Sequence, residues 1–428
     1  MTVLLLFVLF TLLLLVGVPI SFAMGLSAVA ILVLGGTVPL LVLPQRFFSS
    51  LDSFPLMAIP LFILAGNLMN VSGITMAIVR FANSLIGHVR GGLGQVNILT
   101  SLLFSGISGS AAADVAAVGS MLLPAMKKEG YKPEWAAVIT AVSAILGPII
   151  PPSLLMVLYG SMTGLSIGTL FLAGILPGLV IAGLLMAYTW YRADDIGGIR
   201  HPRANLSEVL PAFWKALPAL VLPVLIIGGI ETGAFTATEA GILAVVYALA
   251  YGLLARQLGF RNTYVFVRDA AISTSSILII LGGAALFSWI IAREGFPEQL
   301  ATALQALTTN TYLALGLIVA ALLVLGMFVE TISALILVTP MLSPIGAVYG
   351  LDPIHFAVVT VITVLLGSIT PPVAIILLLA CRIGEVPYAK AMKPFLPYFG
   401  IVLVGLLIIT FVPSVTLALP WALGVLGN

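Results

Sequence analysis

A 31-residue segment of this sequence recurs without a gap 220 positions farther along the chain. Residues 122–152 read LLPAMKKEGYKPEWAAVITAVSAILGPIIPP, and residues 342–372 read LSPIGAVYGLDPIHFAVVTVITVLLGSITPP. Each copy ends in an apolar run that is interrupted by a glycine and two adjacent prolines. Proline removes a backbone donor and clashes with the preceding helical turn, so each copy predicts a helix that is broken near its middle.

Charged residues are too few to cover the surface of a water-soluble protein. They make up 7% of the 428 positions, hydrophobic residues make up 61%, and the mean hydropathy is +1.25. In soluble domains, roughly a quarter of all residues are charged. Apolar runs of about 20 residues suit helices and not barrel strands, so we expect an all-α polytopic membrane protein. The single cysteine, Cys381, excludes an internal disulfide, and no nucleotide motif or catalytic residue indicates an enzyme.

The lysines and arginines predict which loops face the cytoplasm, because cytoplasmic loops are enriched in both residues. Loops without them, around Gly164 and over 228–239 and 346–353, are expected in the periplasm. The apolar N-terminus has no basic residue before Arg46, unlike a signal peptide, so we expect a retained first helix with a periplasmic N-terminus. The segments predicted to be cytoplasmic are 80–90, 127–132, 192–203, 256–268 and 382–393.

Two segments are predicted to leave one side of the membrane and return to it. The first, 91–126, has basic flanks at both ends, and its middle, FSGISGSAAADVAAVG, is small and polar. The second lies within 308–349 and contains GMFVETISALILVTP, and neither of its flanks is basic. Non-helical backbone at membrane depth is tolerated only against protein or a water-filled cavity, so both segments are interpreted as re-entrant hairpins that enter from opposite sides.

The repeat and the hairpins together predict two inverted-topology repeats, a signature of secondary transporters. Each repeat would carry one hairpin and one broken transmembrane helix. The predicted parts are a first repeat over 1–190 with its hairpin at about 91–126 and its broken helix at about 135–163, a cytoplasmic linker over 191–210, and a second repeat over 211–428 with its hairpin at about 311–345, its broken helix at about 355–380 and a C-terminal helix.

The breaks have the chemistry of a site for a small cation. Proline frees carbonyl oxygens one turn earlier, and glycine lets backbone approach closely. Carbonyl and hydroxyl oxygens coordinate a cation without a fixed charge. The alternative is a plain kink that helps helices to pack, but two symmetric copies, each facing a hairpin, favour the ion site. The nearby hydroxyls are those of Thr140, Ser143, Thr360, Thr363 and Thr370.

Two carboxylates, Asp114 and Glu330, fall inside the predicted hairpins. An acidic residue at membrane depth is a functional hypothesis, either as a cation ligand or as a proton relay. The alternative is a helix cap, because each lies near a hairpin turn. The sequence GISG at 106–109 also matches a pattern of intramembrane serine proteases, but the three histidines fall at loops or segment ends, away from the depth that a base would need.

Three motifs, GISGSAAADVAAVGSMLLPAM, GPIIPPS and GSITPPVA, resemble those of the large membrane subunit of tripartite ATP-independent periplasmic (TRAP) transporters. The resemblance covers nearly the whole chain. It implies an elevator-type secondary transporter of the bacterial inner membrane that uses a sodium gradient to import an organic acid, such as sialic acid or a C4-dicarboxylate. It also implies two partners, a small four-helix membrane subunit and a periplasmic substrate-binding protein.

The resemblance further implies two sodium sites, one where each hairpin meets its break, with Na⁺ as coupling ion and no organic cofactor. The first site would use Ser105, Gly106, Ser108, Ser143, Gly147, Pro148 and Pro151. The second would use Gly326, Glu330, Thr363, Gly367, Thr370 and Pro371. Polar residues of the substrate pathway would be Ser110, Asp114, Thr140, Thr331, Ser333 and Thr360.

Three other functions stay open from the sequence alone. A stand-alone ion-coupled dicarboxylate symporter would transport without a binding protein, and a passive channel would conduct solute without sodium. An intramembrane protease would form a covalent adduct at Ser108.

Overall fold

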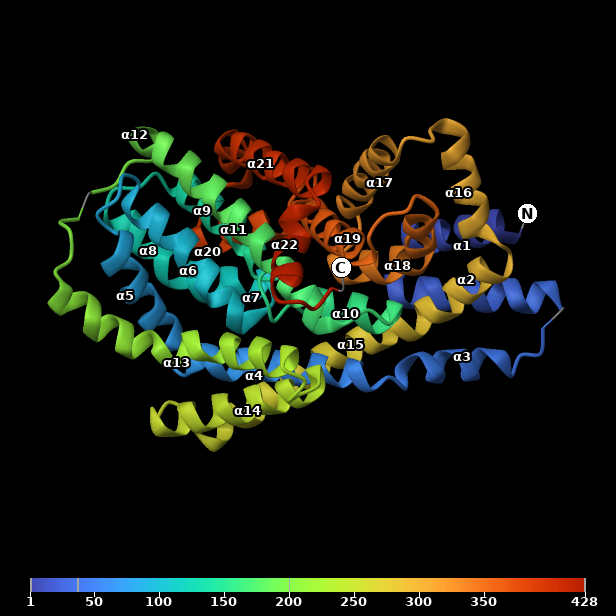
Figure 1. Ribbon diagram of the computed structural model, residues 1–428, viewed down its shortest axis with the longest axis horizontal. Coiled ribbons are helices and arrows are strands. Elements are labelled where there is room, and N and C mark those ends of the chain that lie inside the picture. The colour runs from blue at the N-terminus through green and yellow to red at the C-terminus, as the bar shows by residue number, and fades with distance from the viewer. Residues whose placement is uncertain (1, 37, 200, 427–428) are drawn as a thin grey trace.

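The computed structural model describes residues 2–36, 38–199 and 201–426, without the side chains of Phe260 and Arg261. Apart from one isolated β-bridge between Tyr131 and Gly197, the regular structure of these residues is helical (Figure 1). Within the described residues, seven helices are long and apolar enough to cross a membrane, and a bent pair with an angle of 120° would make eight. The predicted all-α membrane fold is confirmed.

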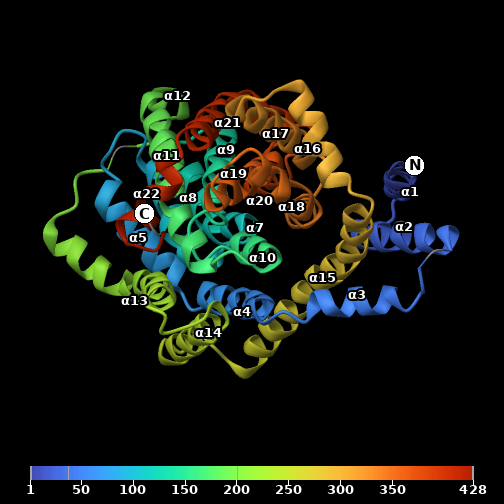
Figure 2. The ribbon, with the colours of Figure 1, turned by 45° about the vertical axis from the view of Figure 1, so that its right-hand side comes forward.

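One group of helices, here called the scaffold, includes the long lower side of the molecule in Figures 1 and 2. Helix α15 packs against α2, α3 and α4, α14 packs against α4, and α13 packs against α5. The scaffold helices are α1 (Thr2–Leu15), α2 (Ile20–Gly35), α3 (Val42–Leu51), α4 (Ala58–Val71), α5 (Ile74–Ile86), α13 (Leu206–Glu231), α14 (Ala237–Leu254), α15 (Phe260–Arg293) and α16 (Phe296–Leu307).

The remaining helices form the core, which lies above the scaffold in Figure 1. Its most buried helices are α9 and α19, in which almost every side chain is covered. The core helices are α6 (Gly92–Ser108), α7 (Ala111–Asp114), α8 (Ser120–Lys128), α9 (Pro133–Ser143), α10 (Leu154–Thr163), α11 (Ile167–Tyr191), α12 (Ala193–Ile196), α17 (Thr311–Gly326), α18 (Thr331–Val348), α19 (Pro353–Gly367), α20 (Ile375–Gly384), α21 (Tyr388–Phe411) and α22 (Ser414–Ala422).

The first hairpin consists of α6, a tight turn, and a second arm that runs through α7 and a π-helical turn into α8. Gly109 closes α6 with a φ of 57°, a left-handed conformation that glycine adopts without strain. The open end is held by Tyr131, whose hydroxyl donates to the Gly91 carbonyl at 3.0 Å and accepts from the Leu93 amide at 2.8 Å. The two arms therefore start and finish at the same place.

The second hairpin consists of α17 and α18, with its turn over 327–330. Its open end is closed in a similar way by Tyr349. The Tyr349 hydroxyl donates to the Thr308 carbonyl at 2.9 Å, and the Thr311 hydroxyl donates to the Tyr349 carbonyl at 3.3 Å.

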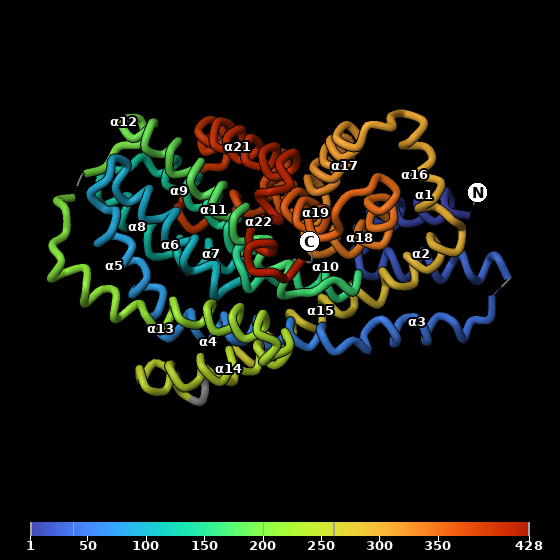
Figure 3. Tube along the Cα trace, in the orientation of Figure 1, coloured from blue at the N-terminus to red at the C-terminus, as the bar shows by residue number. Residues whose placement is uncertain are grey.

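The two broken helices run antiparallel through the core. Helix α9 leads through a 3₁₀ turn and the break at 147–153 into α10, and α19 leads through the break at 368–374 into α20. Helix α9 packs against α20, whereas α10 packs against α19, so the pairs lie side by side in opposite directions (Figure 3). Inverted repeats predict this arrangement. Each double proline contains one cis peptide bond, at Pro151–Pro152 and at Pro371–Pro372.

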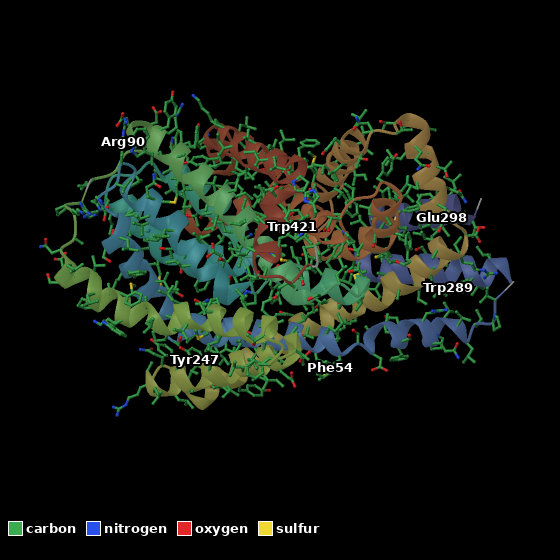
Figure 4. All side chains as sticks on the ribbon, viewed as in Figure 1. Phe54, Arg90, Tyr247, Trp289, Glu298 and Trp421 are labelled. Atoms are coloured by element: carbon green, nitrogen blue, oxygen red, sulfur yellow. The ribbon has the colours of Figure 1, made fainter. Side chains whose placement is uncertain are left out.

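Four of the five basic segments contact one another, as their predicted common location requires. Arg90 lies at this end of the molecule, and Trp289 and Glu298 lie at the other (Figure 4). The contacts are an ion pair of Arg90 with Asp194, an ion pair of Lys127 with Glu385 at 3.8 Å, a bond between the His201 Nε2 and Glu129 Oε2 atoms at 3.0 Å, and a bond from the Lys132 amide to the Ile196 carbonyl at 3.0 Å.

The predicted linker over 191–210 is shorter than expected at its far end. Helix α13 begins at Leu206, because Asn205 and Glu208 form a capping box there. The Glu208 carboxylate accepts from the Asn205 amide at 3.2 Å.

Candidate functional site

A cavity of about 300 Å³ lies between the core and the scaffold, next to the tip of the first hairpin. The core contributes polar atoms of Ser108 and Ser110, the first residue of α10 (Leu154) and a residue of the first turn of α18 (Ile332). The scaffold contributes polar residues from α4 and α15. The complete lining is Ile63, Gly66, Asn67, Asn70, Phe104, Ser108, Ser110, Ala113, Leu154, Ser273, Ile277 and Ile332.

Two glycines let the first hairpin tip lie directly on the scaffold. A Cβ atom on Gly66 of α4 would lie 3.2 Å from the Ile107 carbonyl oxygen. A Cβ atom on Gly106 of α6 would lie 2.4 Å from Cγ of Pro223 in α13. The first contact is with backbone and is tight, whereas in the second the Pro223 ring fills the space beside Gly106.

The same tip meets the first break. A Cβ on Gly109 would lie 2.7 Å from the Pro152 carbonyl oxygen, and one on Gly147 would lie 3.2 Å from the Ser110 carbonyl oxygen. The hydroxyl of Ser108 is buried here and has no hydrogen-bond partner among the described residues. Carbonyl and hydroxyl oxygens of the hairpin tip and of the break therefore lie on either side of this contact, and oxygens of both kinds are ligands of hard cations.

Other residues expected at the first site are occupied by local bonds. The Ser105 hydroxyl donates to the Leu102 carbonyl, and the Pro148 carbonyl accepts from the hydroxyl of Ser153, which also caps α10. A hydroxyl that donates one bond still has lone pairs to offer.

Ser143 and Thr140 lie deeper in the core, outside the cavity. The Ser143 hydroxyl contacts that of Ser101 at 3.1 Å and the Asn97 Oδ1 atom at 3.3 Å. The Asn97 Nδ2 atom donates to the Thr140 hydroxyl at 2.7 Å. Because Ser101 is two helical turns before Ser108 in α6, this network joins α6 to α9 well below the hairpin tip.

Asp114 is fully buried, and both of its carboxylate oxygens lack a hydrogen-bond partner among the described residues. The neighbouring polar group is Ser101, in a geometry that falls short of a hydrogen bond. The cap of α7 is Ser110, whose hydroxyl accepts from the Ala113 amide at 3.4 Å. The alternative that Asp114 caps a helix is therefore wrong, and its carboxylate stays available to a cation or a proton.

The second hairpin meets the second break at two glycines. A Cβ on Gly326 would lie 2.7 Å from the Gly367 Cα atom, and a Cβ on Gly367 would lie 2.5 Å from the Gly326 Cα atom. Thr363 and Thr370 donate to the carbonyls of Val359 and Leu366, at 2.7 and 2.8 Å, and keep their lone pairs. The buried Thr360 hydroxyl has no partner among the described residues. Pro371 lies in the break that follows.

Glu330 behaves differently from Asp114, because it does cap a helix. Its Oε2 atom accepts from the Ser333 amide at 3.1 Å and from the Ser333 hydroxyl at 3.3 Å at the start of α18. Thr331 is the first residue of that helix and precedes the cavity residue Ile332.

The repeat continues beyond the segment that the sequence identities mark. With the same shift of 220 positions, Gly106 corresponds to Gly326 and Ser110 to Glu330. The first pair consists of close-contact glycines, and the second pair consists of the caps that follow the two hairpin turns. Serine and glutamate have in common only an oxygen atom that accepts a hydrogen bond, so a comparison of residue identities does not match these two positions. Asp114 corresponds to Ala334 and has no counterpart.

Comparison with known proteins decides the family. The family model described as "Tripartite ATP-independent periplasmic transporter, DctM component" matches residues 7–415. The chain belongs to this family. The sialic acid TRAP transporter large permease protein SiaM of Vibrio cholerae is 37% identical over 95% of this chain and 96% of its own length. The C4-dicarboxylate TRAP transporter large permease protein DctM of Rhodobacter capsulatus is 34% identical over 99% and 100%.

The DctM family assignment confirms the resemblance seen in the motifs. Its relatives are named as transporter permeases, so this chain is a membrane transport protein and not an enzyme. The crystal structure of the Alcanivorax borkumensis YdaH transporter has a TM-score of 0.61 and 15% identity, and covers 89% of this chain and 88% of that one. This likeness shows a shared fold.

Sequence reasoning missed the scaffold side of the cavity. Asn67 and Asn70 lie three positions apart in α4 and therefore on one face, and Ser273 lies in α15. The two asparagines in the otherwise apolar run LAGNLMNV are the signal that could have identified α4 as a helix that lines the cavity.

Proposed function

We propose that this chain is the sodium-coupled permease subunit of a TRAP transporter that imports a small organic acid. The observation that carries this proposal is the cavity between the first hairpin tip and the scaffold. Helix α10 begins at the cavity with Leu154 in its lining, and its N-cap is the neutral Ser153, whereas the N-terminus of α18 is already capped by the Glu330 carboxylate. The N-terminal end of a helix carries partial positive charge and favours a carboxylate.

Neutral groups complete this environment for an anion. Hydrogen bonds would come from the amides of Asn67 and Asn70 and the hydroxyls of Ser108, Ser110 and Ser273. The volume of about 300 Å³ is at the lower end for small-molecule pockets, which suits a small organic acid. Relatives named for sialic acid, C4-dicarboxylate and 2,3-diketo-L-gulonate support an acidic substrate.

The two hairpin–break contacts are the proposed sodium sites. At the first, the carbonyls of Ser110 and Pro152 lie at the contact between tip and break, and the buried Ser108 hydroxyl has no partner among the described residues. At the second, the Gly326–Gly367 contact brings the hairpin against the threonines of α19 and its break. Each site joins two segments, so sodium would hold each hairpin in the conformation that shapes the cavity.

The proposed movement is an elevator, in which the core slides along the scaffold. Gly66 and Gly106 present no side chains of their own at this interface, and this supports a sliding contact. A small membrane subunit and a periplasmic binding protein are the proposed partners. The isethionate TRAP transporter permease protein DctMQ of Oleidesulfovibrio alaskensis is 38% identical, and this chain spans only 64% of its length, which supports a second membrane part.

Uptake by reconstituted protein tests the proposal. The chain, the small subunit and the binding protein encoded with it are combined in liposomes, and uptake of labelled organic acid is followed under imposed sodium or proton gradients. We expect uptake that needs sodium and the binding protein. Robust uptake by the chain alone would instead identify a stand-alone symporter, and solute flux without sodium would identify a channel.

A further inference from the structure

A second cavity, with a lining that shares no residue with the first, lies where α5, the linker before α13 and α13 itself meet. It has a volume of about 910 Å³ and adjoins a smaller one of about 420 Å³ that shares Ser84, Arg203 and Asn205 with it. Three cationic side chains line the larger cavity: Arg80 of α5, Arg203 of the linker and Lys215 of α13. None of the three forms an ion pair with any described residue.

The cavity keeps an excess of positive charge, because the Glu208 carboxylate in its lining offsets only one of the three cations. Glu208 also accepts from the Asn205 amide at the start of α13. His201, also in the lining, is bonded to Glu129 of the core. Asn83 also belongs to the lining, but its Oδ1 atom is buried next to Gly87 and adds no charge to the cavity.

Apolar side chains continue from this charged cavity along the outer face of α13. Leu206, Leu210 and Trp214 are 81%, 54% and 61% exposed. Trp214 belongs to the cavity lining, so the indole stands between the cations and the apolar face. Tryptophan at such a boundary is typical of the level of lipid headgroups.

We propose that this cavity binds the headgroup of an anionic glycerophospholipid, with its acyl chains along α13. The three cations would contact the phosphate, and Leu206 and Leu210 would contact the chains. Basic pockets between membrane helices bind anionic headgroups in this way. Free phosphate would satisfy the cations but leave the apolar face uncovered, so the combination favours a lipid. The bound lipid would connect the linker, which leads to the core, to two scaffold helices.

Lipid retention by the purified full chain tests this site. Native mass spectrometry counts the phosphatidylglycerol and phosphatidylcholine molecules that stay bound in the parent and in the triple variant Arg80→Gln/Arg203→Gln/Lys215→Gln. The matched control is Arg382→Gln/Lys390→Gln/Lys393→Gln, which removes the same charge from exposed positions outside the cavity. We expect the cavity triple to bind phosphatidylglycerol on the order of 100-fold more weakly and the control to match the parent.

A second readout does not depend on the triple variant. Phosphatidylglycerol with brominated acyl chains, added in detergent at one molecule per chain, should quench fluorescence in the parent and much less in Trp214→Phe. Equal retention of phosphatidylglycerol by the two triples, equal retention of phosphatidylcholine, displacement by inorganic phosphate, or loss of the lipid when the small subunit binds would each overturn the proposal.

Discussion

Replacing Gly326 with alanine tests whether the second hairpin must touch the second break. The new Cβ would lie 2.7 Å from the Gly367 Cα atom and 3.0 Å from the Val364 carbonyl oxygen, both of them backbone atoms. Ordinary contact begins near 3.4 Å, so α17 must move away from α19 by about 0.7 Å. Overpacking of this kind costs about 1–3 kcal/mol.

Gly316 supplies a matched control in the same helix. A Cβ there would meet Cζ of Phe411 at 3.5 Å, which is ordinary contact. Any gain in helix propensity from glycine to alanine is common to both variants, so the difference between them isolates the clash. We expect Gly326→Ala to have the lower apparent melting temperature of the two in detergent, by an amount that corresponds to about 1–3 kcal/mol.

The same displacement should weaken sodium binding. If the shift removes about 1.4 kcal/mol from the second site, the sodium concentration for half-maximal uptake rises about tenfold. The assay is uptake against sodium at a fixed concentration of binding protein, with Gly316→Ala measured in parallel. Identical melting temperatures and sodium curves for the two variants would show that the Gly326–Gly367 contact is neither tight nor part of an ion site.

Three further predictions concern topology and coupling. In a Cys381→Ser background, cysteines at Lys128 and Gly350 should be labelled from opposite sides of the membrane, and labelling from one side would refute the inverted repeats. Thr370→Val removes a buried hydroxyl at nearly constant volume and should raise the half-maximal sodium concentration about tenfold; an unchanged uptake curve would mean that this break is only a kink. Asp114→Asn should lower the apparent affinity for the coupling ion more than Glu330→Gln, because Glu330 already binds the Ser333 amide, and the reverse order in the same assay would contradict this assignment.

The elements that were predicted well from the sequence are those determined by residues that lie next to one another in the chain. A glycine followed by two prolines breaks a helix wherever it lies, and a small polar segment between two similar flanks indicates a hairpin. The structure adds the antiparallel packing of α9 with α20, which the inverted repeat requires.

The elements that escaped prediction depend on packing between distant segments. Asn67 and Ser273 reach one cavity only because α4 and α15 pack together beside the first hairpin. Ser143 is four residues before Gly147, but its hydroxyl is directed towards Ser101 of another helix. Asp114 and Glu330 look alike in the sequence, and only the positions of nearby amides distinguish an unpartnered carboxylate from a cap.

The antiparallel pairing of α9 with α20 has a consequence for biogenesis. Helix α20 begins at Ile375, 242 positions after the start of α9 at Pro133, so α9 leaves the ribosome long before its partner exists. At about 5–20 residues per second, this delay is roughly 12–48 s. During that time a break with exposed carbonyls must wait in the bilayer, or in the insertion machinery, without the helix that covers it. Neither half of the chain can bury its broken helix by itself. The contacts of α9 are complete only when α20 has been inserted.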